Sequence, residues 1–252
     1  NRRDQRSQVI NNNHLLDVSG TYGYNNGMSA TLSVPYLSGK RSNRDGLDLI
    51  QFNAARTEII GFTSREEAGD VDGVGDVSIM LRKWMGDLRQ KKGNVQLGLG
   101  VAIPTGDNDV RRLNRFIPAG QARVAGNVRL REITMDQSMQ PGVGEYGYIG
   151  DVQAFRVIKD TTLYFTGTYI AYPTELNGVP TFRRDPNEAI MSAADQYLVR
   201  GGALFSNVFK HAPWLTFGLG MRWEGVPVED IFGGSRGFRR PGYAISVEPS
   251  IT

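Results

Sequence analysis

The segment that most constrains the fold spans residues 93–107, GNVQLGLGVAIPTGD, in which every second residue is apolar. Its apolar residues are Val95, Leu97, Leu99, Val101 and Ile103. Successive side chains of a β-strand point to opposite faces, so this period of two predicts a strand with one apolar and one small or polar face. The apolar face must lie against either a second sheet or lipid.

The same alternation recurs along the chain and predicts nine strands in all. Each is close to the length that a tilted transmembrane strand requires. The expected strands span residues 14–24, 28–37, 76–85, 93–107, 146–157, 162–172, 196–206, 215–224 and 242–251.

The links between these strands alternate in length without exception. The short links are 25–27, 86–93, 159–161 and 207–213, and the long ones are 38–75, 105–145, 173–195 and 225–241. A soluble sandwich has no reason to place every long loop at one end, whereas outer-membrane barrels have short periplasmic turns and long external loops. The pattern therefore predicts an all-β protein of the bacterial outer membrane, a transmembrane antiparallel up-and-down β-barrel.

An odd number of strands is unusual, because bacterial barrels of this kind have even numbers. We expect residues 1–252 to be a single barrel domain that lacks an N-terminal strand from a full barrel of about 10–12 strands. The chain ends in SIT without a terminal aromatic residue, which leaves open the absence of C-terminal strands as well. The alternative is a further strand within a long loop, for which residues 54–62 and 121–133 are the candidates.

Composition is compatible with a barrel and excludes several other classes. The mean hydropathy of -0.34 is typical of a soluble protein, and no apolar run approaches the roughly 18 residues of a membrane helix. The net charge of +3 is too small to indicate nucleic acid binding. Cysteine is absent, which excludes disulfides and thiolate metal sites.

Tyrosine and tryptophan residues fall near the ends of the expected apolar faces. Such residues form girdles at the membrane–water interface of barrels, although in a soluble β protein they would be core aromatics. They are Tyr22, Tyr24, Tyr36, Tyr148, Tyr169, Tyr197 and Trp223.

Charged residues alternate with the apolar ones, so we expect them to line the lumen. Both signs occur, which leaves two interpretations open: mutual ion pairs that fill the lumen, or a charged constriction that filters small polar or ionic solutes. The lumen candidates are Asp17, Arg82, Asp151, Arg200, Arg222, Glu224 and Glu248.

Arginines in the long loops could contact lipid phosphates or a protein partner at the external face, or simply be solvated. They are Arg183, Arg184, Arg236, Arg239 and Arg240.

Other motifs carry little chemistry. The G-x-G-x-x-G match at 142–147 leads into an expected strand rather than a helix, so no dinucleotide site is predicted. Asp70, Asp72 and Asp76 are weak metal candidates in a glycine-rich acidic stretch, where a solvated loop is the alternative. His14 and His211 are the only histidines, so we expect neither an enzyme nor a cofactor.

Several segments resemble a known family: GVGDVSIMLRKWM, LGLGVAIPTGD, MDQSMQPGVGEYGYIGDVQAF, TGTYIAYPTELNG and RWEGVP. They are similar to the outer-membrane barrel proteins, labelled transporters, of the meta-pathway of phenol degradation. Pro104 to Asp107 and Gln140 to Gly144 match two of that family's strand-end motifs. The resemblance implies a barrel of twelve strands and the passage of apolar aromatic compounds.

These observations predict a passive channel or uptake protein for small molecules, embedded in outer-membrane lipids and without a nucleic acid partner. The alternative is a structural or scaffold barrel with a plugged lumen, whose long external loops bind a protein partner. A soluble lipid-carrier barrel is a third hypothesis.

Overall fold

The computed structural model describes residues 9–24, 26–52, 59–87, 92–116, 129–181, 185–208, 212 and 214–251. The chain divides into two compact units. Unit 1 comprises residues 1–16, 35–75 and 106–142, and unit 2 comprises residues 17–34, 76–105 and 143–252. The described residues form strands and two short 3-10 helices, η2 (Gln137–Met139) and η3 (Pro186–Glu188), which confirms the all-β prediction.

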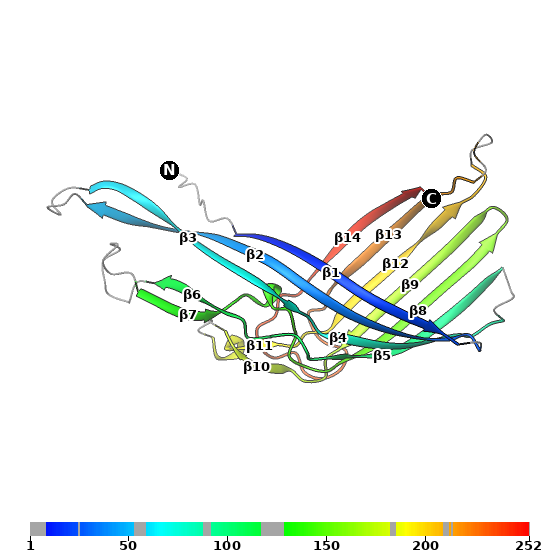
Figure 1. Cartoon of the computed structure of the whole chain (residues 1–252), viewed down its shortest axis with the longest axis horizontal. Helices are drawn as coiled ribbons and strands as arrows, with labels where there is room; N and C mark the ends of the chain where they lie inside the picture. The colour runs from blue at the N-terminus through cyan, green and yellow to red at the C-terminus, as the bar shows by residue number, and fades with distance from the viewer. Residues whose placement is uncertain are drawn as a thin grey trace. The chain divides into compact units, whose positions relative to one another are not determined.

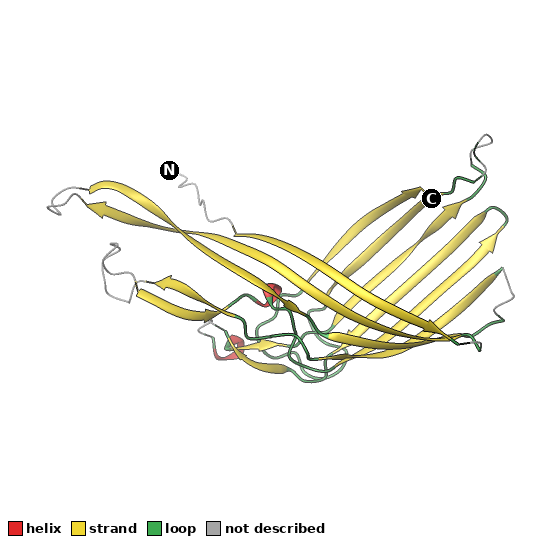
Figure 2. Cartoon of the chain, viewed as in Figure 1, coloured by secondary structure: helices red, strands yellow, loops and turns green. Residues whose placement is uncertain are grey.

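Unit 2 is built on an antiparallel sheet whose nine strands curl into a half-barrel (Figures 1 and 2). Each strand pairs with the next in the row, as in an up-and-down barrel. β1 and β2 contribute only their residues from unit 2. In order, the strands are β1 (Val9–Gly23), β2 (Met28–Phe52), β4 (Val77–Trp84), β5 (Gly93–Ile103), β8 (Gly147–Ile158), β9 (Thr161–Ala171), β12 (Gln196–Phe205), β13 (Phe217–Val226) and β14 (Gly242–Ile251).

These are the nine strands that the alternation predicts. Two short links show why the turns can be tight. In the first, Gly27 has a φ of 80° and the Tyr24 N–H donates to the Met28 carbonyl at 2.8 Å. Between β8 and β9, Lys159 takes a φ of 52° in a link of only two residues. Among the described residues, the two end strands, β1 and β14, do not pair with each other.

The prediction that residues 38–75 form a loop is wrong. β2 continues to Phe52 and pairs with β3 (Ile59–Val74) from Tyr36 opposite Val74 onward. This pairing satisfies the backbone N–H and C=O groups of both strands, which in an unpaired loop would have to hydrogen-bond to water. The other long links also contain short pairs: β6 (Arg111–Phe116) with β7 (Arg129–Thr134), and β10 (Leu176–Pro180) with β11 (Ile190–Ser192).

The two candidate strands within long loops are therefore partly confirmed. β3 includes residues 59–62 and β7 includes residues 129–133, while the remainder of both candidates lies outside the described residues. Neither strand enters the row of nine, because β3 pairs with β2 beyond that row and β7 pairs with β6. The even count of 10–12 strands stays a prediction.

Unit 1 has a small core of its own. Val71, Met135 and Met139 are buried together, and Val110 packs against them. A Cβ added at Gly39 would lie 2.8 Å from the Met139 Cε, so the Met139 side chain packs closely against β2 at this glycine. Asp136 caps η2 by accepting the Ser138 N–H at 3.1 Å.

No helix in the described part of the chain is long and apolar enough to cross a membrane.

Candidate functional site

All seven lumen candidates lie on one face of the unit 2 sheet. The strand register places Arg82, Gly98 and Asp151 side by side on β4, β5 and β8. Further along the sheet, Arg200 lies opposite Arg222, and Glu248 lies opposite Gly220. Leu81, Leu99 and Gly150 occupy the neighbouring row on the opposite face. We call the two sides the polar face and the apolar face.

The polar face is the concave one. A Cβ added at Gly98, on the polar face, would lie 2.9 Å from the Arg82 Cγ and 3.1 Å from the Asp151 Cβ. A Cβ added at Gly150, on the apolar face, would have no heavy atom within 4 Å. Side chains converge on the inside of a curved sheet and diverge on the outside, so this difference gives the direction of the curl.

Arg82 and Asp151 form the most buried ion pair of the polar face. The Arg82 Nε donates to the Asp151 Oδ1 at 2.7 Å, and the Asp151 side chain is only 4% exposed. The Thr168 hydroxyl donates to the other carboxylate oxygen at 3.0 Å, and the Arg82 guanidinium also donates to the Thr31 hydroxyl at 3.2 Å. The pair thus joins β2, β4, β8 and β9 across the inner wall.

A second group of charges lies nearer the end of the sheet. Arg200 and Arg222 are direct cross-strand neighbours, a placement that is unfavourable for like charges unless each is compensated. The Arg200 guanidinium lies 2.8 Å from the Glu248 carboxylate, and Arg222 pairs with Glu224. The Arg222 Nε is buried and has no hydrogen-bond partner among the described residues.

Large side chains of the polar face lie over the glycines of neighbouring strands. A Cβ at Gly202 would be 2.7 Å from the Tyr164 hydroxyl, and Gly220 is covered by the same tyrosine. Met80 covers Gly100 in the same way. The small residues between the apolar positions of residues 93–107 are therefore needed because the inner wall is crowded.

Asp17 completes the set of lumen candidates. Its carboxylate accepts a hydrogen bond from the Ser33 hydroxyl on β2. Nearby on the same two strands, the Thr21 and Thr31 hydroxyls are 2.9 Å apart. The wall next to β1 is thus held by neutral hydrogen bonds as well as by charge.

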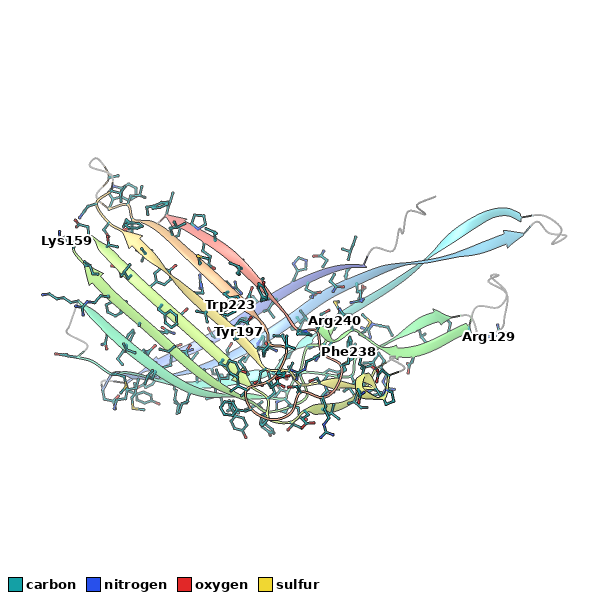
Figure 3. All side chains as sticks on the ribbon, turned by 180° about the vertical axis from the view of Figure 1, so that it is seen from behind. Arg129, Lys159, Tyr197, Trp223, Phe238 and Arg240 are labelled. Atoms are coloured by element: carbon teal, nitrogen blue, oxygen red, sulfur yellow. The ribbon has the colours of Figure 1, made fainter. Side chains whose placement is uncertain are left out.

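The apolar face has no protein layer over it in the part of the chain that the structure describes. Leu99 is 76% exposed, whereas Gln96 on the polar face is 7% exposed. Tyr197 and Trp223 meet edge-on with their ring centroids 5.1 Å apart (Figure 3). The expected girdle residues are exposed or half-buried rather than core aromatics, and their position at a membrane interface stays a prediction.

Arg239 does not face outward as expected for an external contact. Its guanidinium binds both carboxylate oxygens of Asp230, and its side chain is only 8% exposed. It also donates to the Ser192 hydroxyl at 3.0 Å. Asp230 in turn accepts the Asp195 N–H at 3.0 Å, so the links 173–195 and 225–241 are joined.

Asp195 is a structural residue that the alternation does not reveal, because a single aspartate in a loop has no periodicity. It is fully buried, and it accepts the Tyr172 N–H at 2.8 Å and the Ile231 N–H at 3.2 Å. Burial raises the pKa of the neighbouring Tyr172 hydroxyl well above its usual value, and the charges of Asp76 and Asp195 raise it further.

The other loop arginines differ from Arg239. Arg236 is 79% exposed and pairs with Glu175, and Arg240 lies over the Phe238 ring at 5.6 Å (Figure 3). Arg183 and Arg184 lie outside the described residues.

The three metal candidates do not converge. Asp70 and Asp72 lie opposite Lys40 and Ser38 in the β2–β3 pair, and the Asp76 carboxylate accepts the Val143 N–H at 2.8 Å. No group of three possible metal ligands comes together among the described residues.

Two segments singled out by the resemblance meet in unit 1. The Gly142 N–H donates to the Asp107 carbonyl at 3.0 Å. A Cβ at Gly106 would lie 2.7 Å from the Gly142 Cα, so the two backbones touch where only glycine fits. These motifs therefore have a structural role in joining the ends of one long link.

No protein-family model matches this chain, and no curated protein matches it. The class that the fold defines is an antiparallel, up-and-down β-sheet protein of barrel type with a polar concave face.

Proposed function

We propose that this protein is an outer-membrane β-barrel whose polar concave face lines a passage for small molecules. The observation that carries the proposal is the inverted burial of β5, in which Leu97 and Leu99 are exposed while Gln96 and Gly98 are buried. A soluble protein buries its large apolar side chains, and an extended exposed apolar surface marks an interaction site. Exposed apolar side chains at every second position of a curled sheet form one apolar outer surface. Such a surface matches the lipid-facing side of a transmembrane barrel.

The charges of the polar face favour small neutral or weakly polar solutes. Arg82, Arg200 and Arg222 are each paired with a carboxylate, so the wall offers little net field to attract or reject an ion. Selectivity then depends mainly on size and on contacts with the wall. Aromatic compounds, the solutes implied by the family resemblance, belong to this class.

One observation favours a second function, that of a structural barrel with a plugged lumen. Tyr164 reaches across Gly202 and Gly220, and the paired arginines occupy part of the concave face. Side chains alone can fill a narrow barrel. In this case the long links would serve as the binding surface for a protein partner.

Reconstitution of the full chain in planar bilayers separates the two functions. Membrane insertion is first verified by protease protection and by a β-rich circular dichroism spectrum. Stepwise conductance, together with swelling of liposomes in a small neutral solute, is the result expected of a passage. Inserted protein without conductance or swelling contradicts the passage and supports the plugged barrel, and failure to insert contradicts both.

A further inference from the structure

The apolar face of unit 2 contains a groove that the proposed passage does not use. It crosses β4, β5, β8, β9 and β12 and has a volume of about 810 Å³, within the range of small-molecule sites. Its walls are aliphatic and aromatic side chains, among them Leu81, Leu97, Leu99, Val152, Phe165 and Val199.

Two glycines form the floor of this groove. Gly150 lies between Leu99 and Tyr169 in its row, and Gly167 lies between Val152 and Val199 in the next. The side chains of Val152 and Phe165 lie 3.2 Å and 3.5 Å from a Cβ added at Gly167, whereas the surface above Gly150 is hollow. A Cβ at Gly150 would have no heavy atom within 4 Å, so the hollow is open above it.

Three charged residues line the groove: Arg82 and Asp151, which are paired with each other on the polar face, and a further cation, Lys83, at the rim. Lys83 lines the groove, is exposed, and has no ion-pair partner among the described residues. It lies one residue before the end of β4 at Trp84, close to the short-turn edge of the sheet. On the apolar positions of β4, β5, β8, β9, β12, β13 and β14, the only charges are Lys83 and Arg156, and neither is acidic.

We propose that this groove binds one acyl chain of an anionic membrane lipid, with the lipid phosphate at Lys83. Hydrocarbon walls suit an acyl chain and offer few polar groups to any other ligand. The ammonium at one end attracts an anionic headgroup more strongly than a zwitterionic one, whose own cation offsets the charge of its phosphate. The inference rests on the proposed function, since the apolar face must first meet lipid.

Trp223 supplies a probe beside the groove, because its cross-strand partner Val199 lines the wall. The full chain is given the changes Trp84→Phe and Trp214→Phe, so that Trp223 is the sole tryptophan. It is then folded into phosphatidylcholine vesicles that contain a small, fixed mole fraction of either brominated phosphatidylglycerol or brominated phosphatidylcholine. Bromine quenches Trp223 fluorescence only when the lipid is adjacent.

We expect the anionic lipid to occupy the site with about fivefold preference, the size that one basic residue contributes at a membrane surface. Lys83→Gln should abolish the preference but retain quenching by both lipids. Gly150→Leu should fill the floor and remove the preference as well. The matched controls are Arg156→Gln, the other cation of this face, and Gly20→Leu, another glycine with no heavy atom within 4 Å of an added Cβ. Both should behave like the parent protein.

Equal quenching by the two brominated lipids in the parent protein overturns the lipid site and leaves the barrel proposal standing. A preference that survives Lys83→Gln and Gly150→Leu also overturns it. Absence of quenching by either lipid shows that Trp223 does not face the bilayer, which contradicts the proposed function itself and the groove with it.

Discussion

Arg82 and Asp151 form an ion pair across β5, a strand to which neither belongs, and Gly98 lies between them on the same face. The side chains converge over this glycine because the sheet is curved and because no Cβ separates them. The ion pair between β4 and β8 therefore requires a small residue at position 98 of β5, the strand between them.

We expect Gly98→Val to lower the free energy of unfolding by about 1–3 kcal/mol, the range for overpacking a filled site. The new side chain would meet the Arg82 Cγ at 2.9 Å and force the pair apart. Denaturant unfolding in detergent micelles measures the change. Gly150→Val, on the open side of the same sheet, is the control and should alter stability by less than about 0.5 kcal/mol. Equal losses in the two variants would contradict the crowding of the polar face.

Asp151→Asn tests how much the buried Arg82–Asp151 pair contributes to the free energy of unfolding. The Asp151 side chain is 4% exposed and that of Arg82 is 23% exposed, so removal of the negative charge leaves a poorly solvated guanidinium. We expect a loss near the lower end of the roughly 3–5 kcal/mol that breaking a buried pair costs. Glu224→Gln breaks a pair whose partners are both more than a third exposed, and should cost less than about 1 kcal/mol. A larger loss of stability in Glu224→Gln than in Asp151→Asn would contradict the expectation that the more buried pair contributes more.

The charge balance of the wall predicts a change in ion selectivity. In Glu224→Gln/Glu248→Gln, Arg200 and Arg222 lose their carboxylate partners and remain as adjacent positive charges. If the protein conducts, its reversal potential in a KCl gradient should shift toward chloride. Glu175→Gln, in a link beyond the strands, should leave the reversal potential unchanged. The prediction fails if the double variant keeps the selectivity of the parent.

Asp109 makes part of the stability of unit 1 dependent on pH. The Arg111 guanidinium lowers the pKa of the Asp109 carboxyl, and the Thr134 hydroxyl lowers it further. Because the folded-state pKa is depressed, this stabilisation is present above the unfolded value of about 3.9 and is lost as the pH falls through the folded value. The pair is partly exposed, so screening by solvent keeps its contribution to stability small.

The parent protein should therefore unfold at a higher temperature than Asp109→Asn at pH 7, and the gap should narrow as the pH falls below the unfolded pKa of about 3.9. Thermal scans of both proteins at pH 7 and at a series of lower pH values provide the measurement. A gap that is unchanged at the lower pH values would show that charge is not the cause.

Arg239→Met should release the junction between the links 173–195 and 225–241. The change leaves the fully buried Asp230 carboxylate without its cation, which costs roughly 3–5 kcal/mol for a buried pair. We expect new protease cleavage in both links together with the loss of stability. Arg236→Met removes a guanidinium that is 79% exposed, and should leave the cleavage pattern unchanged. Identical patterns in the two variants would contradict a structural role for Arg239.

The alternation of residue types by itself determined the strands and their two faces. Leu97, Gly98 and Leu99 follow a period of two that depends only on local backbone geometry, so the placement of charged residues on one face could be predicted without coordinates. The turn at Gly27 could be predicted for the same local reason. The extension of β2 to Phe52 could not, because its polar residues have no clear period and strand pairing with β3 decides their conformation.

Only the tertiary structure decided which charges meet. Asp151 and Arg82 are 69 residues apart, and Arg239 is 47 residues from Ser192, so their contacts depend on strand register and on how two links fold over each other. The hollow above Gly150 likewise depends on Leu99 and Tyr169 from adjacent strands. The alternation of apolar and polar side chains is a property of one strand. Strand pairing, burial and grooves depend on how neighbouring strands are aligned. That register is not encoded in any single segment.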